Sequence, residues 1–98
     1  MTEEKIYSLI GQIIDPEVGV DIVNLGLVYG VNILDINNVK VTMTMTSRGC
    51  PLHKFITDEV NSKIKREYPD AEIEVDLVWD PVWTADMMSD QARMTLGW

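Results

Sequence analysis

The single cysteine, Cys50, is the residue of this sequence best placed to do chemistry. It follows Gly49 and precedes Pro51, and proline is favoured at the first position of an α-helix. The sulfur is therefore expected near a helix N-terminus, where unpaired N–H groups and the positive end of the helix dipole favour a thiolate. Arg48 would add positive charge. The alternative is a small buried apolar side chain, which is common for free cysteine.

His53 lies three residues after Cys50, so both side chains would share one face of the first helical turn. They could ligate one metal ion, or His53 could be an ordinary solvated surface residue. With one cysteine, the chain cannot form an internal disulfide or a zinc or iron–sulfur site held only by its own cysteines. Any cluster bound at Cys50 would need ligands from elsewhere.

Three carboxylates, Asp15, Glu17 and Asp21, fall within one short segment. Such a group could supply hard oxygen ligands to a metal ion or act as a general base. The alternative is a helix stop at Asp15, which precedes Pro16, followed by an exposed polar turn.

The elements that must position these residues follow from the apolar periodicity. A helix is expected from Thr2, the N-cap, to Asp15, with one apolar stripe. A second helix is expected from Pro51 to about Tyr68, and a third from about Ser89 to Leu96, where Gly97 ends it. The stripe of the first helix is Ile6, Leu9, Ile10 and Ile13, and that of the second is Leu52, Phe55, Ile56, Val60 and Ile64.

Strands are expected over residues 27–34, 39–46 and 72–77, with a turn at 35–38 between the first two. In the second strand valines and methionines alternate with Thr42, Thr44 and Thr46, which we assign to the outer face. Trp79 and Trp83 are expected to cover the edge of the core. The order α-β-β-α-β-(α) predicts an α+β fold, a two-layer sandwich with a small three-stranded sheet and helices on one face. We assign residues 1–98 to one domain.

The charge balance excludes one class of function. The net charge is −8, whereas binding to phosphate backbones needs clustered lysine and arginine. The order of elements also resembles one type of KH domain, but the sequence has no G-x-x-G loop. No apolar run is long enough to span a membrane, and the acidic N-terminus is unlike a signal peptide. We expect a cytoplasmic protein that binds neither nucleic acid nor membrane.

Several ordered motifs together resemble a known family. Residues 44–52 (TMTSRGCPL) are similar to the T-x-T-x-x-G-C-P-L signature of a small iron–sulfur assembly family. This family includes the SufT proteins, the PaaD subunit associated with phenylacetyl-CoA oxygenase and the eukaryotic cytosolic cluster-targeting factor. Residues 15–17 (DPE), 21–29 (DIVNLGLVY), 79–83 (WDPVW) and 92–97 (ARMTLG) also match its pattern.

The resemblance implies a non-catalytic factor in the assembly, maturation or delivery of iron–sulfur clusters. It implies a functional patch of Cys50 with Asp15, Glu17, Thr46 and Ser47 gathered near it. Cys50 would ligate iron or a cluster partially and transiently, with no stably bound cofactor. His53 has no counterpart in the family pattern, and only its spacing to Cys50 makes it a weak candidate ligand. Partners would be assembly or carrier proteins, client apoproteins and, in a homodimer, a second copy of the chain. A thiol enzyme with Cys50 as nucleophile is the alternative; His53 would be its only histidine base.

Overall fold

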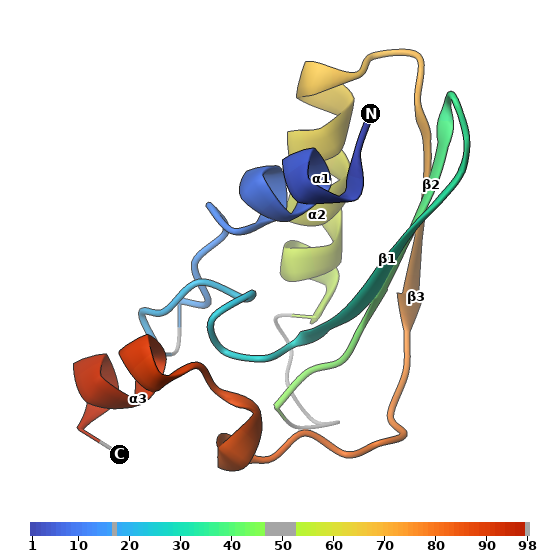
Figure 1. Ribbon diagram of the computed structural model, residues 1–98. Helices are drawn as coiled ribbons and strands as arrows, with labels where there is room; N and C mark the ends of the chain where they lie inside the picture. Colours follow the sequence, from blue (N-terminus) through green and yellow to red (C-terminus); the bar gives the residue numbers. More distant parts are fainter. Residues whose placement is uncertain (17, 47–52, 98) are drawn as a thin grey trace.

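The computed structural model describes residues 1–16, 18–46 and 53–97 (Figure 1). Within these ranges the chain forms helices and strands in the order α-β-β-α-β-α, with a short 3₁₀ helix, η1, before the last helix. Their bounds are α1 Glu3–Ile10, β1 Val28–Asp35, β2 Asn38–Met43, α2 His53–Glu67, β3 Glu72–Leu77, η1 Ala85–Met87 and α3 Asp90–Leu96. The predicted order of elements and the α+β class are confirmed.

The sheet has the order β1-β2-β3, with β1 antiparallel and β3 parallel to the central strand β2. A tight turn closes the β1–β2 hairpin. There the carboxylate of Asp35 accepts hydrogen bonds from the backbone N–H of Asn37 (2.9 Å) and the side-chain amide of Asn38 (2.6 Å). These bonds, the Asn37 bond first, hold the pKa of Asp35 below its ordinary value because they favour the charged form.

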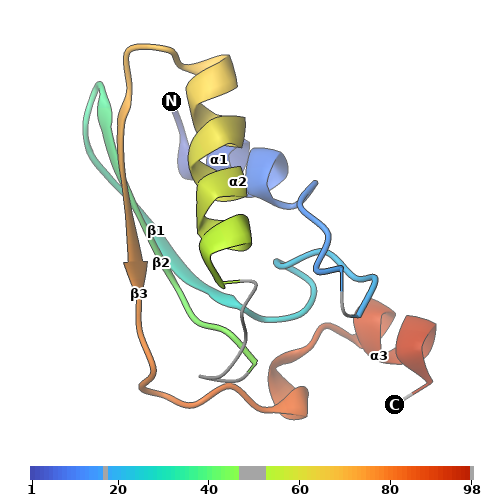
Figure 2. The same cartoon turned by 180° about the vertical axis from the view of Figure 1, so that it is seen from behind.

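Helices α1 and α2 cover one face of the sheet, as both views show (Figures 1 and 2). In the central strand Val39, Val41 and Met43 are at most 1% exposed and face these helices. The opposite face is polar, and Lys40 there forms ion pairs with Glu74 (3.7 Å) and Asp76 (3.6 Å) on β3. This alternation in β2 is what separates the apolar layer from the solvated one.

Helix α1 ends at Ile10, five residues before the predicted stop at Asp15. Gly11 caps it, and a turn follows in which the N–H of Ile13 donates to the Ile10 carbonyl (3.1 Å), before Ile14 pairs with Asp21 in an isolated bridge. The backbone N–H of Ile22 donates to the carbonyl of Ile13 (3.0 Å). Ile13 is still buried, but in this paired loop, so long-range pairing prevails over the helical periodicity.

Fewer residues of α2 are buried against the core than predicted. Ile56, Val60 and Ile64 are fully buried, but Phe55 is 47% exposed, and Leu52 lies outside the described residues. Residues spaced by four lie nearly above one another on a helix, whereas Phe55 is displaced by about 100° from Ile56. The prediction for Phe55 was wrong because it treated neighbouring positions as one stripe.

Helix α3 lies beyond the lower end of the sheet (Figures 1 and 2). Its ends are those predicted: the hydroxyl of Ser89 accepts a hydrogen bond from the Ala92 N–H (3.1 Å), and Gly97 terminates the helix with φ +71°. Among the helices in the described ranges, none combines the length and apolar character that crossing a membrane requires.

Candidate functional site

The residues of the predicted patch divide into two groups. Asp15 and Thr46 lie within the described part of the chain, and His53 is the first residue of α2. Cys50, Glu17 and Ser47 lie outside the described residues, so their position in the patch stays a prediction.

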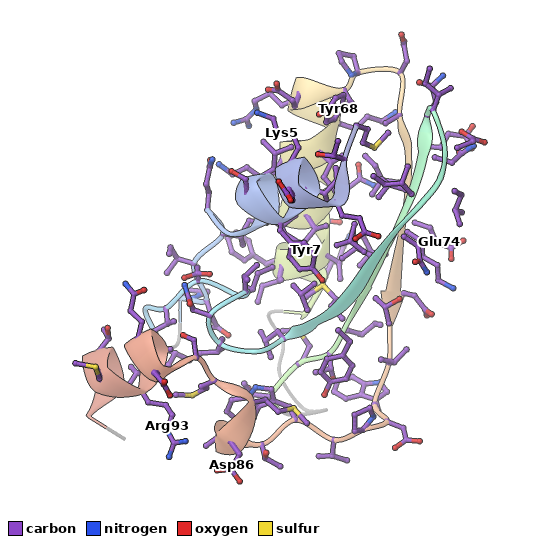
Figure 3. All side chains as sticks on the ribbon, viewed as in Figure 1. Lys5, Tyr7, Tyr68, Glu74, Asp86 and Arg93 are labelled. Carbon is purple, nitrogen blue, oxygen red and sulfur yellow. The ribbon has the colours of Figure 1, made fainter. Side chains whose placement is uncertain are left out.

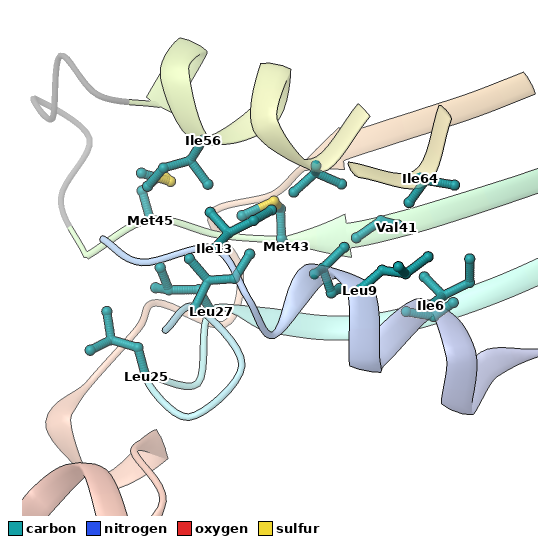
Figure 4. Packing of buried hydrophobic residues seen from close by; sticks show 14 of the residues in the cluster. Ile6, Leu9, Ile13, Leu25, Leu27, Val41, Met43, Met45, Ile56 and Ile64 are labelled. Carbon is teal, nitrogen blue, oxygen red and sulfur yellow. The ribbon is translucent and has the colours of Figure 1, made fainter. Parts of the chain in front are cut away.

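The segments that carry the patch meet at one end of the core. Ile13, Met45 and Ile56 belong to the same buried cluster and lie close to one another in Figure 4. Ile13 is two residues before Asp15, and Met45 directly precedes Thr46. Ile56 lies in the first turn of α2, three residues after His53. The packing of these buried neighbours brings together the loop after α1, the end of β2 and the start of α2.

Asp15 is part of the folded interior rather than of an exposed turn. It is 2% exposed. Its N–H donates to the Val20 carbonyl (3.0 Å), and its own carbonyl accepts from the N–H groups of Val18 (3.2 Å) and Gly19 (2.8 Å). The alternative of a helix stop with a solvated carboxylate is wrong for this residue, because the helix ends earlier and the side chain is buried.

Asp21, the third carboxylate of the segment, has a local structural role. Its carboxylate accepts hydrogen bonds from the backbone N–H (2.9 Å) and the side-chain amide (2.6 Å) of Asn24. These bonds fix the turn that leads towards β1. Within the part of the chain that the structure describes, no three His, Cys, Asp or Glu side chains are grouped to hold a metal ion.

The alternation of β2 stops before the predicted patch. The strand ends at Met43, and Thr44, which we expected on the outer face, is fully buried between the buried Met43 and Met45. Its backbone N–H donates to the Leu27 carbonyl (2.8 Å), which continues the antiparallel pairing one residue beyond the ends of β1 and β2. Its hydroxyl has no hydrogen-bond partner among the described residues.

Replacing Thr44 with valine is therefore expected to raise the free energy of unfolding by about 1 kcal/mol, since a buried hydroxyl without a partner carries a desolvation cost that a methyl group does not. Urea unfolding measures this. Thr42→Val is the matched control; Thr42 is half-exposed, and we expect a change within about 0.5 kcal/mol. A loss of stability specific to Thr44→Val would show that the hydroxyl is bonded by a group outside the described residues.

A junction between residues 21–29 and 79–89 supports the same end of the molecule. The indole N–H of Trp83 donates to the Leu25 carbonyl (2.8 Å), and the N–H of Ser89 donates to the Asn24 carbonyl (2.8 Å). The hydroxyl of Tyr29 donates to the Pro81 carbonyl (2.7 Å). Trp79 and Trp83 are half-buried against the core, as predicted, but the hydrogen bonds across this junction were not predicted from the sequence.

The backbone of Met87 packs against Gly26 in this junction. The φ of Gly26 is +82°, and a Cβ at this position would lie 2.3 Å from the backbone oxygen of Met87. The signal that could have revealed the junction was the presence of both the 21–29 and the 79–83 motifs in one chain.

Comparison with known proteins identifies the family. The model of the family described as "Iron-sulfur cluster assembly protein" matches residues 3–77, from the start of α1 to the end of β3. The chain belongs to this iron–sulfur cluster assembly protein family.

Named relatives and a solved structure agree with this family. The chain is 48% identical to the Fe-S protein maturation auxiliary factor YitW of Bacillus subtilis, over 97% of this chain and 93% of that protein. It is 51% identical to the Fe-S protein maturation auxiliary factor SufT of Staphylococcus aureus, over 87% and 97%. A crystal structure of a domain of unknown function from Bacillus anthracis superposes with a TM-score of 0.92 at 48% identity, covering 97% of this chain and 91% of that one.

Proposed function

We propose that this protein is a non-enzymatic factor that helps to assemble iron–sulfur clusters or deliver them to apoproteins, acting through Cys50. Membership of the iron–sulfur cluster assembly protein family supports this proposal, as do the names of YitW and SufT as maturation auxiliary factors. Iron or a cluster is cargo in this scheme. Its partners are assembly or carrier proteins and client apoproteins.

The observation that carries the proposal is the meeting of three chain segments at one end of the core. The loop that contains Asp15, the end of β2 with Thr46 and the start of α2 at His53 come together through Ile13, Met45 and Ile56. Cys50 lies in the stretch of chain between Thr46 and His53. Asp15, whose side chain is 2% exposed, belongs to one of these three segments.

In this proposal each residue type has a distinct role. The Cys50 thiolate is an iron ligand, the carboxylates of Asp15 and Glu17 attract the cation, and the hydroxyls of Thr46 and Ser47 hydrogen-bond to bound sulfur or thiolate. One thiolate satisfies only part of a cluster, so the remaining ligands come from a partner, a second copy of the chain or a small thiol. This incomplete ligation suits a factor that must release its cargo.

Anaerobic reconstitution with ferrous iron, sulfide and a small thiol tests this function. We expect the wild-type protein to acquire iron and visible absorption, and Cys50→Ser to lose most of both because a serine hydroxyl is a poor ligand for iron in a cluster. His53→Asn measures any contribution of a second ligand from α2. Ser62→Ala, a change at an exposed position of α2, is the control and should behave as wild type. Equal iron uptake by Cys50→Ser and wild type would contradict the proposed role of Cys50.

A further inference from the structure

An open apolar groove of about 630 Å³ lies at the junction of residues 21–29 and 79–89. The residues that line it are Val23, Gly26, Val28, Tyr29, Pro81 and Met87. None of them carries a charge. The one side-chain polar group, the hydroxyl of Tyr29, already donates to the Pro81 carbonyl (2.7 Å) and lies 3.5 Å from the Met87 sulfur.

The walls of this groove are held by the junction itself. Tyr29 joins one wall to the other, and the indole of Trp83 is bonded to Leu25 directly before Gly26. Because Gly26 has no side chain, the backbone at Met87 approaches it closely and closes the floor. A groove fixed in this way needs little ordering when a ligand binds, which favours affinity.

The surroundings of the groove are acidic. Residues 21–29 and 79–89 contain no lysine, arginine or histidine. Asp80 and Asp86 are exposed and directly flank the lining residues Pro81 and Met87. Figure 3 shows Asp86 on η1 at the lower edge of the molecule, with Arg93 on the neighbouring α3. Asp90 adds a further exposed carboxylate at the start of α3, so acidic groups outnumber Arg93 in this region.

We propose that this groove docks an extended peptide segment of a partner protein, one that carries an apolar side chain flanked by lysine or arginine. The apolar side chain fills the groove, and the cations face Asp80 and Asp86. Complementary charge at the rim of an interface accelerates association and selects the partner, while the buried apolar group supplies most of the affinity. Only the identity of the partner, an assembly protein or a client, rests on the proposed function; the docking of the peptide does not.

Fluorescence anisotropy with labelled nine-residue peptides tests the docking. The first peptide has the sequence GKKSLSKKG; the second replaces its leucine with serine, and the third replaces its lysines with glutamate. Burying one leucine stabilises a complex by about 1.5–3 kcal/mol, so we expect the serine peptide to bind at least about tenfold more weakly. The glutamate peptide should not bind, and binding of the first peptide should weaken with added salt.

Variants then locate the site. Val28→Thr keeps the shape of the groove wall but makes it polar, and Asp86→Lys reverses a rim charge; each is expected to weaken binding about threefold to tenfold. Asp70→Lys makes the same charge change at an exposed residue between α2 and β3, away from the groove, and should leave binding nearly unchanged. Thermal unfolding of each variant confirms that it is folded.

The peptide measurements would overturn the proposal if the leucine peptide does not bind, if the serine peptide binds equally well, or if Asp86→Lys and Asp70→Lys have equal effects. A concentration-dependent dimer whose amide chemical-shift changes cover Val23 and Met87 would also overturn it, by assigning the groove to a second copy. Peptide binding does not require iron. If the peptides fail to bind, the reconstitution result for Cys50 is therefore unaffected. Conversely, failed reconstitution leaves peptide binding intact and refutes only the function.

Discussion

Cells that carry Cys50→Ala in place of the wild-type chain are expected to lose its entire contribution to iron–sulfur enzyme activity, while the protein itself stays folded. Alanine removes the chain's only thiol, so no other side chain can supply a thiolate ligand to iron. The described residues alone contain a large buried apolar cluster that stabilises the fold. We therefore expect the free energy of unfolding to fall by no more than about 1 kcal/mol.

The measurement is the activity of a host iron–sulfur enzyme in a strain that lacks the native gene, with the amount of each variant determined by immunoblot. Ser62→Ala on α2 is a truncation of similar size at an exposed site and should restore activity fully. If Cys50→Ala restores activity as well as wild type does, the thiol is not the functional group. If the purified variant is unfolded at growth temperature, Cys50 is instead a structural residue.

Among the glycines that the structure describes, Gly26→Ala is expected to be the most destabilising substitution, with a loss of more than about 3 kcal/mol. Two costs combine. An L-residue at φ +82° pays about 1–2 kcal/mol for the left-handed backbone. The new Cβ would also lie 2.3 Å from the Met87 oxygen, a backbone atom that can move only if the junction with residues 79–89 opens.

Two other glycines separate these costs. Gly19 has φ +80°, but a Cβ added there would meet no described atom within 4 Å, so Gly19→Ala pays only the backbone cost. Gly30 in β1 has no positive φ, and a Cβ added there would meet no described atom within 4 Å. Gly30→Ala should be neutral or slightly stabilising because glycine weakens a strand. Urea unfolding should rank the losses Gly26, Gly19, Gly30. Equal losses for Gly26→Ala and Gly19→Ala would show that the contact with Met87 does not limit stability.

Local signals in the sequence predicted local structure well. The alternation around Val41 identified the central strand, and Ser89 and Gly97 marked the ends of α3, because caps and pleats depend on neighbours within a few residues. The end of α1 was predicted wrongly. The rule for a residue before proline is local, whereas Ile13 is drawn out of the helix by a backbone bond from Ile22.

The site was predictable to a lesser degree. The motifs indicated that Asp15 and Thr46 belong together, and the structure places their buried neighbours in one cluster. The burial of Thr44 and the bond between Trp83 and Leu25 were not foreseen. The latter joins residues 58 positions apart, and a periodic pattern contains no information on which distant carbonyl an indole will meet. The groove depends on such contacts and therefore could not be predicted from the sequence.

The hydrogen bonds from Trp83 and Ser89 to Leu25 and Asn24 also constrain how the chain folds during its synthesis. Residues 21–29 are translated early, yet the groups that complete their hydrogen bonding are translated only after β3. Until then the Leu25 carbonyl and the apolar side chains of Val23 and Val28 remain uncovered by residues 79–89 on a nascent chain whose α1, α2 and sheet can already form. Closing so long a loop is slow relative to local folding. As the chain leaves the ribosome, this end of the molecule should therefore be the last part to become protected from proteases. A chaperone would bind the nascent chain at this stage, before residues 79–89 have docked.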